Sequence, residues 1–226
     1  MVEHEPLPVR ARGTRQRETG AASRRETRRL LLLAAGELFA ERGYAAATVT
    51  SIADRAEVSL QTLYLAWGSK RALLRAFMES SLRDCPEGVI DAQWVAQVSA
   101  GIDAQVGPAG DGRVRLQGLA HQYRLICERA ALGWKLYRDA AAVDSEIEAD
   151  WTALQSLRRG TFAGLIGQLP AEALRPGLTP EAAADTAWAI ASPETYDLLV
   201  RHASWSLDAY EQWVGTTLIS ALLAEA

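Results

Sequence analysis

Apolar residues recur at three- and four-residue intervals along most of the chain, and this spacing predicts helices. No alternating apolar–polar pattern of useful length indicates a strand, so the sequence predicts an all-α fold. Residues 1–22 lack the helical period and carry two prolines, two glycines and four arginines, so we expect a disordered, arginine-rich arm there. From Ser23 a helical pattern runs to Gly43, which is placed to end the helix.

Two short helices are predicted next, over 48–56 and 59–67. Each starts at a hydroxyl residue, Thr48 or Ser59, that can cap the free N–H groups of a first helical turn. A fourth helix follows from Ser69. Two short helices joined by a tight turn favour a helix-turn-helix, in which the second helix lies in a DNA major groove.

A chain break near 85–88 (Cys-Pro-Glu-Gly) marks a predicted boundary between a helix-turn-helix domain over 23–84 and a larger helical domain over 85–226. Within the second domain, proline and glutamate follow Thr179 and Ser192, which is typical of helix starts. The remaining helices are expected at about 89–106, 113–131, 132–142 and 146–168, with a final helix from Ser206 to Leu223.

The charge of the chain is unevenly distributed. The net charge is -4, but residues 1–83 hold 14 Lys+Arg against 9 Asp+Glu and so carry +5, which leaves -9 for residues 84–226. A basic N-terminal part joined to an acidic remainder indicates a module that faces a polyanion.

Cysteine content and hydropathy predict a cytoplasmic protein. The two cysteines, Cys85 and Cys127, are too few for a disulfide framework and are expected as reduced thiols. No uncharged apolar run reaches the length of about 18 residues that a spanning helix needs, and the N-terminus does not resemble a secretory signal. No membrane association, cofactor or metal site is expected.

The segment 48–70 holds the candidate DNA contacts. Hydroxyls, amides and cations at the groove rims bind phosphates, and side chains near the start of the recognition helix read base edges. Gln61 can pair with adenine, whereas exposed Leu60 and Leu65 suit contact with thymine methyls. Tyr64 and Leu65 could instead pack on the preceding helix, and Gln61 and Thr62 could be solvated surface residues. The full set of candidate DNA contacts is Thr48, Thr50, Ser59, Leu60, Gln61, Thr62, Tyr64, Leu65, Lys70 and, in the preceding helix, Arg28.

Residues 28–75 resemble the DNA-binding domain of TetR-type transcriptional regulators. The matching stretches are LLLAAGELFAERGY (31–44), TVTSIADRAEVS (48–59), TLY (62–64), and SK with ALL (69–74). The resemblance implies an all-helical homodimer with a small N-terminal helix-turn-helix domain and a larger C-terminal domain that senses a ligand. The contact positions it implies are Thr48, Thr50, Leu60, Gln61, Thr62, Tyr64 and Lys70.

The chain departs from the family pattern at three positions. Glu57 stands where the turn usually has glycine, and glutamate disfavours a positive φ, so a slightly strained or differently shaped turn is expected. Ala66 occupies a position that often holds a phosphate-contacting tyrosine or histidine. Trp67 replaces the usual phenylalanine, which is a tolerable core change. Part of the phosphate binding is therefore expected to fall to arginines before residue 30.

Aromatic residues of the C-terminal part suggest a ligand pocket. Six of the seven tryptophans lie beyond the predicted boundary, and most of them are expected in the core or at an interface. Some could line an apolar pocket in which a histidine offers one polar group, although a hydrogen-bonded core or surface position is the more common role of such a histidine. The acidic balance of this part favours a neutral or cationic ligand. The candidate ligand-binding residues are Trp94, His121, Trp134, Tyr137 and Trp151.

Residues 192–223 resemble the C-terminal end of many TetR-type regulators, where two helices from each subunit form a four-helix dimer interface. Two recognition helices about one DNA turn apart require a dimer, although apolar faces on terminal helices could instead complete the core of the monomer. The candidate interface residues are Tyr196, Leu199, Val200, Trp213, Leu218, Ile219 and Leu222.

Three classes of function compete. The first is a regulator that binds double-stranded operator DNA, most simply a repressor that a largely apolar small molecule releases. The second, an enzyme, is disfavoured because the chain lacks a phosphate-binding glycine loop, metal-ligand spacing and a nucleophile motif. Its acidic run 144–150 is better explained by a loop and a solvated helix start than by a metal site. The third, a ligand carrier that never contacts DNA, is disfavoured by the basic N-terminal part.

Overall fold

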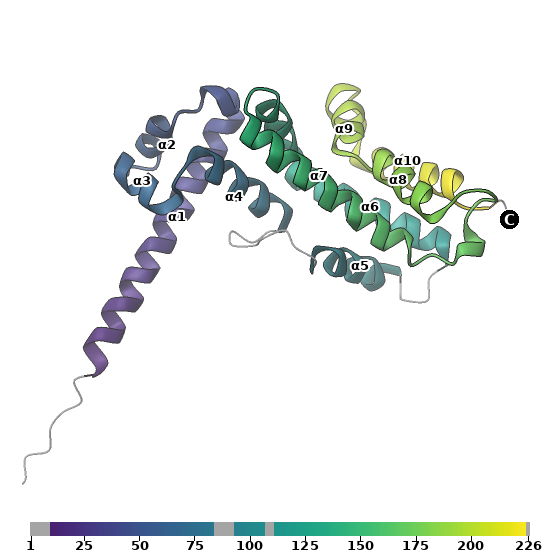
Figure 1. Ribbon diagram of the computed structural model, residues 1–226, viewed down its shortest axis with the longest axis horizontal. Coiled ribbons are helices and arrows are strands. Elements are labelled where there is room, and N and C mark those ends of the chain that lie inside the picture. Colours follow the sequence, from purple (N-terminus) through teal and green to yellow (C-terminus); the bar gives the residue numbers. More distant parts are fainter. Residues whose placement is uncertain (1–9, 84–92, 107–110, 225–226) are drawn as a thin grey trace, which may run out of the picture. The chain divides into compact units, whose positions relative to one another are not determined.

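The computed structural model describes residues 10–83, 93–106 and 111–224, and Figure 1 traces the helices that they form. Within these ranges every regular element is a helix, and the one β-type contact is an isolated antiparallel bridge between Leu174 and Leu223. The predicted all-α fold is confirmed. None of the helices in this part of the chain is long and apolar enough to cross a membrane.

The chain folds as two compact units, Met1–Phe77 and Met78–Ala226. The division falls inside α4 (Lys70–Arg83), whose first half belongs to the N-terminal unit. The boundary suggested by the sequence, at residues 84 and 85, lies where the structure describes no residues.

The N-terminal unit consists of α1 (Arg10–Ala46), α2 (Val49–Arg55), α3 (Leu60–Trp67) and the first half of α4. Each predicted cap is present. Thr48 Oγ1 accepts a hydrogen bond from the backbone N–H of Ser51 at 3.1 Å, and Ser51 Oγ accepts one from the backbone N–H of Thr48, so the pair closes a capping box. Ser59 and Ser69 cap α3 and α4 through their hydroxyls in the same way. The short helices are therefore fixed at their starts by the residues predicted from sequence.

The start of α1 differs from the prediction. Residues 10–22 form its first turns rather than a disordered arm, and residues 1–9 lie outside the described part of the chain. Arginine, glutamate, glutamine and alanine dominate residues 10–29, and all four have high helix propensity. Glu26 and Arg29 also form an ion pair one turn apart at 2.7 Å. Local propensity therefore extends α1 where no apolar periodicity exists.

Gly43 interrupts α1 as expected, but the chain continues as helix to Ala46. Its φ of 75° with ψ of 170° is a conformation that glycine adopts freely and other residues avoid. Before this kink in the sequence, α1 packs closely on α4 at Gly36, where a Cβ would lie only 2.7 Å from the Phe77 ring. Phe77 in turn meets Phe39 edge to face, which closes the core of the unit.

The C-terminal unit is a bundle in which α10 packs along α6, and α7 packs along both α6 and α8. α5 covers α6 and α7. The bounds of its helices are α5 (Gln93–Val106), α6 (Gly112–Ala141), α7 (Ser145–Ile166), α8 (Pro180–Ile190), α9 (Pro193–Tyr196) and α10 (Leu207–Leu222), with a short 3₁₀ helix at Ala171–Ala173.

Two predicted features of this unit differ in the structure. The helices expected over 113–131 and 132–142 are one continuous helix, α6, because Gly133 does not break it. The glycine allows close packing there, since a Cβ would lie 2.5 Å from Met78 Sδ. The helix that starts at Ser192 is α-helical only over α9 and continues as π-helix over Asp197–His202.

The acidic run is a helix start, as the sequence favours. Asp144 is the N-cap of α7, and its carboxylate accepts hydrogen bonds from the backbone N–H groups of Glu146 and Ile147. Glu146 and Glu148 occupy the first turn, where negative charge complements the helix dipole.

Candidate nucleic-acid interface and ligand cavity

The turn between α2 and α3 holds the helix-turn-helix in shape at a cost in backbone strain. Two backbone bonds close it, from the N–H of Glu57 to Asp54 O at 3.1 Å and from the N–H of Val58 to Ala53 O at 3.0 Å. Glu57 adopts a φ of 55°. This left-handed conformation is the one expected at a position where the family pattern usually has glycine. A non-glycine residue in this region costs about 1–2 kcal/mol.

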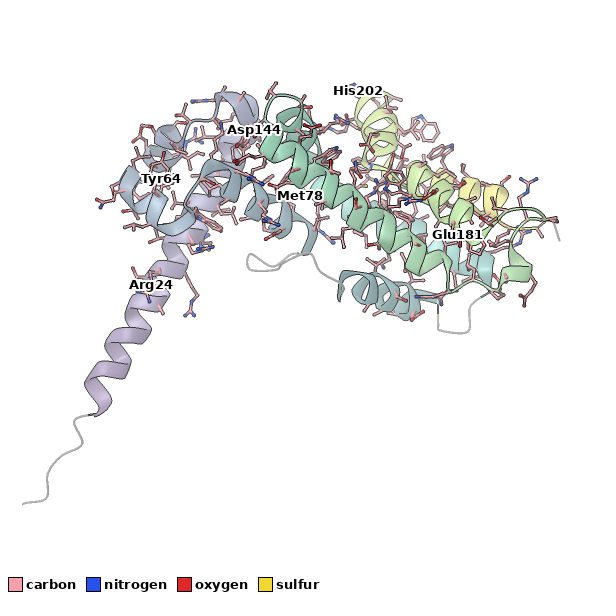
Figure 2. All side chains as sticks on the ribbon, in the orientation of Figure 1. Arg24, Tyr64, Met78, Asp144, Glu181 and His202 are labelled. Atoms are coloured by element: carbon pink, nitrogen blue, oxygen red, sulfur yellow. The ribbon has the colours of Figure 1, made fainter. Side chains whose placement is uncertain are left out.

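α3 presents an exposed face with an unusual share of apolar surface. Its inward anchor, Leu63, is completely buried. On the opposite side Gln61 is exposed, Tyr64 is 48% exposed and Leu65 is 82% exposed, with Leu60 exposed at the helix start. Figure 2 labels Tyr64 on this helix. Leu65 therefore leaves little of its side chain to pack on the preceding helix, whereas about half of the Tyr64 side chain is covered.

The hydroxyl residues around α3 are partly occupied within the unit. Ser59 Oγ and Thr62 Oγ1 lie 2.8 Å apart in a hydrogen bond, so the side chain of half-buried Thr62 is held against the cap. On α2, Thr48 and Thr50 are both exposed, and the hydroxyl of Thr48 is engaged in its capping box. A DNA contact by Thr48 or Ser59 would therefore share a hydroxyl that already fixes a helix start.

Lys70 turns toward its own unit. Its ammonium donates to Ala45 O at 3.3 Å and lies 4.1 Å from the centre of the Tyr44 ring. Burial lowers the pKa of Lys70 because the charged form loses solvation. This side chain ties α4 to the end of α1, and only its remaining donors can meet a phosphate.

Arg28 also serves the unit. Its Nη1 donates to Ala66 O at 2.7 Å, and its guanidinium carbon lies 3.8 Å from the centre of the Trp67 ring. A cation at the free carbonyls of a helix C-terminus complements the helix dipole. Arg28 therefore clamps the end of α3 to α1, a role that the sequence reasoning missed.

The C-terminal unit contains an apolar cavity between α5, α6 and α7, with Leu82 from the end of α4. Its closed part is small, about 40 Å³, and the wider space of about 510 Å³ around it includes open solvent, so a small-molecule ligand has to displace side chains to enter. Its lining residues are Leu82, Val98, Leu119, Tyr123, Ile126, Trp134, Leu154, Leu157, Arg158, Thr161, Phe162 and Leu165.

The predicted pocket residues have different positions. Trp134 lines the cavity, and Trp151 meets its ring edge to face with centroids 5.8 Å apart. Tyr137 is buried but is not part of the lining. The side chain of Trp94 lies outside the described part of the chain.

His121 is not in the cavity. Its Nδ1 lies 3.1 Å from both carboxylate oxygens of Glu211 on α10, and Arg124 Nε donates to the same carboxylate at 2.6 Å. The three residues join α6 to α10. The alternative of a hydrogen-bonded histidine therefore describes His121, and the expectation of a ligand contact there is corrected.

Arg158 is the charged residue of the cavity, and the sequence reasoning missed it. It is only 8% exposed. The signal was available, because Arg158 falls four residues after Leu154 and seven before Leu165 on the apolar face of α7. An arginine in the centre of an apolar helix face must be buried or must find a partner.

Cys127 and two tyrosines form a second buried group in this unit. Burial raises the pKa of Cys127 to about 12, and burial also raises the pKa values of Tyr123 and Tyr210. Cys127 is therefore a neutral thiol at any physiological pH and is unreactive in the folded protein.

The predicted interface residues divide into two groups. Tyr196, Leu218 and Leu222 are buried within the C-terminal unit, so for these three the alternative of a monomer core is correct. Tyr196, for example, packs edge to face on the Tyr210 ring at 5.2 Å. The other four, Leu199, Val200, Trp213 and Ile219, are partly exposed. Near them the structure adds two exposed apolar side chains that the sequence reasoning did not single out, Leu198 at 62% and Trp205 at 37%.

Comparison with known proteins connects this geometry with a family. The model of the bacterial regulatory proteins of the tetR family matches residues 31–77. The HTH-type transcriptional activator FasR of Mycolicibacterium smegmatis (strain ATCC 700084 / mc(2)155) is 39% identical over 113 residues, which make up 50% of this chain and 46% of FasR. This chain thus spans about half the length of that curated relative.

Solved structures share the fold over most of the chain. The structure of a SmeT–triclosan complex has a TM-score of 0.64 and 17% identity, and the match covers 89% of this chain and 93% of SmeT. NalD, the secondary repressor of the MexAB-OprM multidrug efflux pump in Pseudomonas aeruginosa, has a TM-score of 0.55 and 18% identity, with 89% and 99% of the two chains covered. At these identities the likeness concerns the fold.

Proposed function

We propose that this chain, whose residues 31–77 match the tetR family of bacterial regulatory proteins, is a member of that family and acts as a dimeric, ligand-responsive repressor of transcription. The observation that carries the proposal is the exposed face of α3, where Leu60, Gln61, Tyr64 and Leu65 stand clear of the core. Exposed leucines beside an amide and a phenol suit a major groove, which presents thymine methyls, base edges and phosphates together.

The proposed contacts divide by chemistry. Gln61 reads a base edge, and Leu60 and Leu65 contact thymine methyls. Tyr64 donates its phenolic hydrogen to a phosphate, as do Thr50 and the exposed backbone N–H groups at the helix starts. Arg28 and Lys70 contribute mainly by holding α3 and α4 in place, since their cations are already bound within the unit.

Dimerisation is proposed through the C-terminal unit. Leu198, Leu199 and Trp205 leave apolar surface exposed beside Trp213, whose ring meets that of Trp205 at 6.4 Å. Apolar surface of this kind, on residues that follow α8, supports an isologous contact between two copies. The two recognition helices would then face successive major grooves.

The cavity supports a regulatory ligand. A molecule that enters between α5, α6 and α7 favours the arrangement of these helices that accommodates it. If that arrangement positions the two N-terminal units at a different separation, the ligand lowers the affinity for DNA by a coupling that works in both directions. Release from the operator would then restore transcription. The structure of SmeT in a complex with triclosan supports this, because it shows a small molecule bound to a protein of similar fold.

Activation is the second candidate, because the 39% identical relative is named an activator. The two functions share the same DNA contacts and differ in where the operator lies relative to the promoter. A reporter gene under the protein's own upstream region separates them, since deletion of the regulator raises expression for a repressor and lowers it for an activator.

Binding to DNA itself is tested by a salt titration. Fluorescence anisotropy of labelled duplexes from the upstream region should give one tight site for the dimer. Affinity should fall by about 1000-fold between 50 and 200 mM salt if the dimer contacts about six phosphates. A protein that binds none of these duplexes more tightly than a scrambled duplex would not be the proposed regulator.

A further inference from the structure

We infer that the cavity of the C-terminal unit is built for an apolar ligand with one anionic head group, a monocarboxylate, and that Arg158 binds this head group. The regulatory role of such a ligand rests on the proposed function. The expected chemistry of the ligand follows from the residues that line the cavity.

Arg158 is a buried cation that has no counter-ion among the described residues. Its Nη1 donates to Gln155 Oε1 at 3.0 Å, and its Nη2 donates to two backbone carbonyls of α8 and its C-cap, Trp188 O at 2.6 Å and Ala191 O at 2.9 Å. No carboxylate in the described part of the chain forms an ion pair with it. A buried charge normally requires such a partner, because its desolvation is costly.

The guanidinium also has a donor to spare. Its Nε is buried and has no hydrogen-bond partner among the described residues. Arginine carries five N–H donors, and with Nη2 already donating to two carbonyls the Nε–H remains to donate to one carboxylate oxygen. The carbonyls at the end of α8 supply the partial negative charge of a helix C-terminus. They give Nη2 its acceptors but leave Nε without one.

The surroundings of Arg158 are apolar. The guanidinium carbon lies 5.3 Å from the centre of the Trp188 ring, 5.7 Å from that of Phe162 and 6.0 Å from that of Tyr123. Most of the other lining residues are aliphatic, and the lining contains no acidic residue. A ligand that matches these walls is apolar over most of its length and negative at one end.

This assignment replaces the neutral or cationic ligand that the net charge of the C-terminal part suggests. That charge is a sum over 84–226, and several of its acidic groups, such as Glu146 and Glu148, are exposed at helix starts. For a ligand in the cavity, the nearest charged group is Arg158. In a low-dielectric site a near charge outweighs distant screened ones.

The test compares three probes of equal chain length on the full-length protein by isothermal titration calorimetry: decanoate, decanol and decylamine, each below its aggregation concentration. The inference predicts that decanoate binds about tenfold or more tightly than decanol, and that decylamine binds weakest. Equal affinities for decanoate and decanol, or no binding of decanoate, would overturn it. This comparison uses the unmodified protein, so it holds whatever the variants do.

Two variants locate the effect. Arg158→Met keeps the length and apolar volume of the side chain, and it should bring the affinity for decanoate down to that for decanol. Arg159→Met is the matched control. It removes the exposed neighbour that pairs with Asp185 at 2.6 Å, and it should keep the preference. Persistence of the preference in Arg158→Met would place the anion site elsewhere. Binding of the ligand-free wild type to operator DNA is measured in parallel, so a wild type that binds DNA but shows no preference for decanoate contradicts this inference alone.

Discussion

Two basic residues of the N-terminal unit show how much a side chain's role depends on its neighbours. Both Arg28 and Lys70 have the charge that a phosphate contact needs, yet each donates to a backbone carbonyl of its own unit. Sequence reasoning could place both near the proposed DNA-binding face. It could not see Ala66 O or Ala45 O, because those partners depend on how α1 meets the following helices. The sequence therefore predicts the location of these residues better than their chemistry.

The clamp by Arg28 predicts a stability effect. Arg28→Met removes one charged hydrogen bond and one cation–π contact at a surface position, so the unfolding free energy should fall by about 1–2 kcal/mol. Chemical denaturation followed by circular dichroism measures this. Arg24→Met, four residues earlier on the same helix and exposed, is the control and should change stability little. Equal effects of the two changes would show that the clamp contributes nothing.

At the scale of elements, the helix starts were the most predictable features. Thr48, Ser59 and Ser69 cap the helices they were expected to cap, because an N-cap is a local interaction between a hydroxyl and an N–H three residues later. Continuity was less predictable. Gly133 does not break α6, since its partner Met78 comes from a distant part of the sequence. The π-helix that follows α9 has no sequence signal that we can name.

The strained turn between α2 and α3 gives a prediction at this scale. Glu57→Gly should raise the unfolding free energy by about 0.5–1 kcal/mol, because glycine adopts the left-handed φ of 55° without steric cost. The larger entropy that glycine gives to the unfolded chain offsets part of this gain. Glu57→Ala removes the same carboxylate but keeps a Cβ, so it should give no such gain. Thermal unfolding of both variants decides this. A gain in Glu57→Ala as large as in Glu57→Gly would mean that charge, and not backbone strain, limits the turn.

At the scale of the whole molecule, the proposed dimer depends on apolar surface that a single chain leaves uncovered. Leu198→Glu places a charge on the most exposed leucine of the proposed interface, so it should shift sedimentation toward the monomer and weaken DNA binding together. Val143→Glu is matched to it, because Val143 is also apolar and 78% exposed but lies in the turn before α7. A dimer unaffected by Leu198→Glu would place the interface on another surface.

Summed properties of the whole chain were weaker guides than local ones. The basic part of the chain contains the residues that match the tetR family model. The same sums suggest a neutral or cationic ligand, although Arg158 is the one charged residue among the described residues that line the cavity. Three of the seven predicted interface residues are core residues, because periodicity identifies an apolar face without saying what covers it.

The central claim is that α3 reads DNA, and one measurement tests it most directly. The wild type, Tyr64→Ala and Gln61→Ala are titrated against the operator and against the same duplex with single base substitutions. Tyr64→Ala should weaken binding to every duplex alike, whereas Gln61→Ala should lose discrimination at one base position, normally worth about 1–3 kcal/mol. Gln212→Ala, an exposed glutamine of α10, serves as the control. If both α3 variants bind every duplex as the wild type does, α3 is not the recognition helix and the account is wrong.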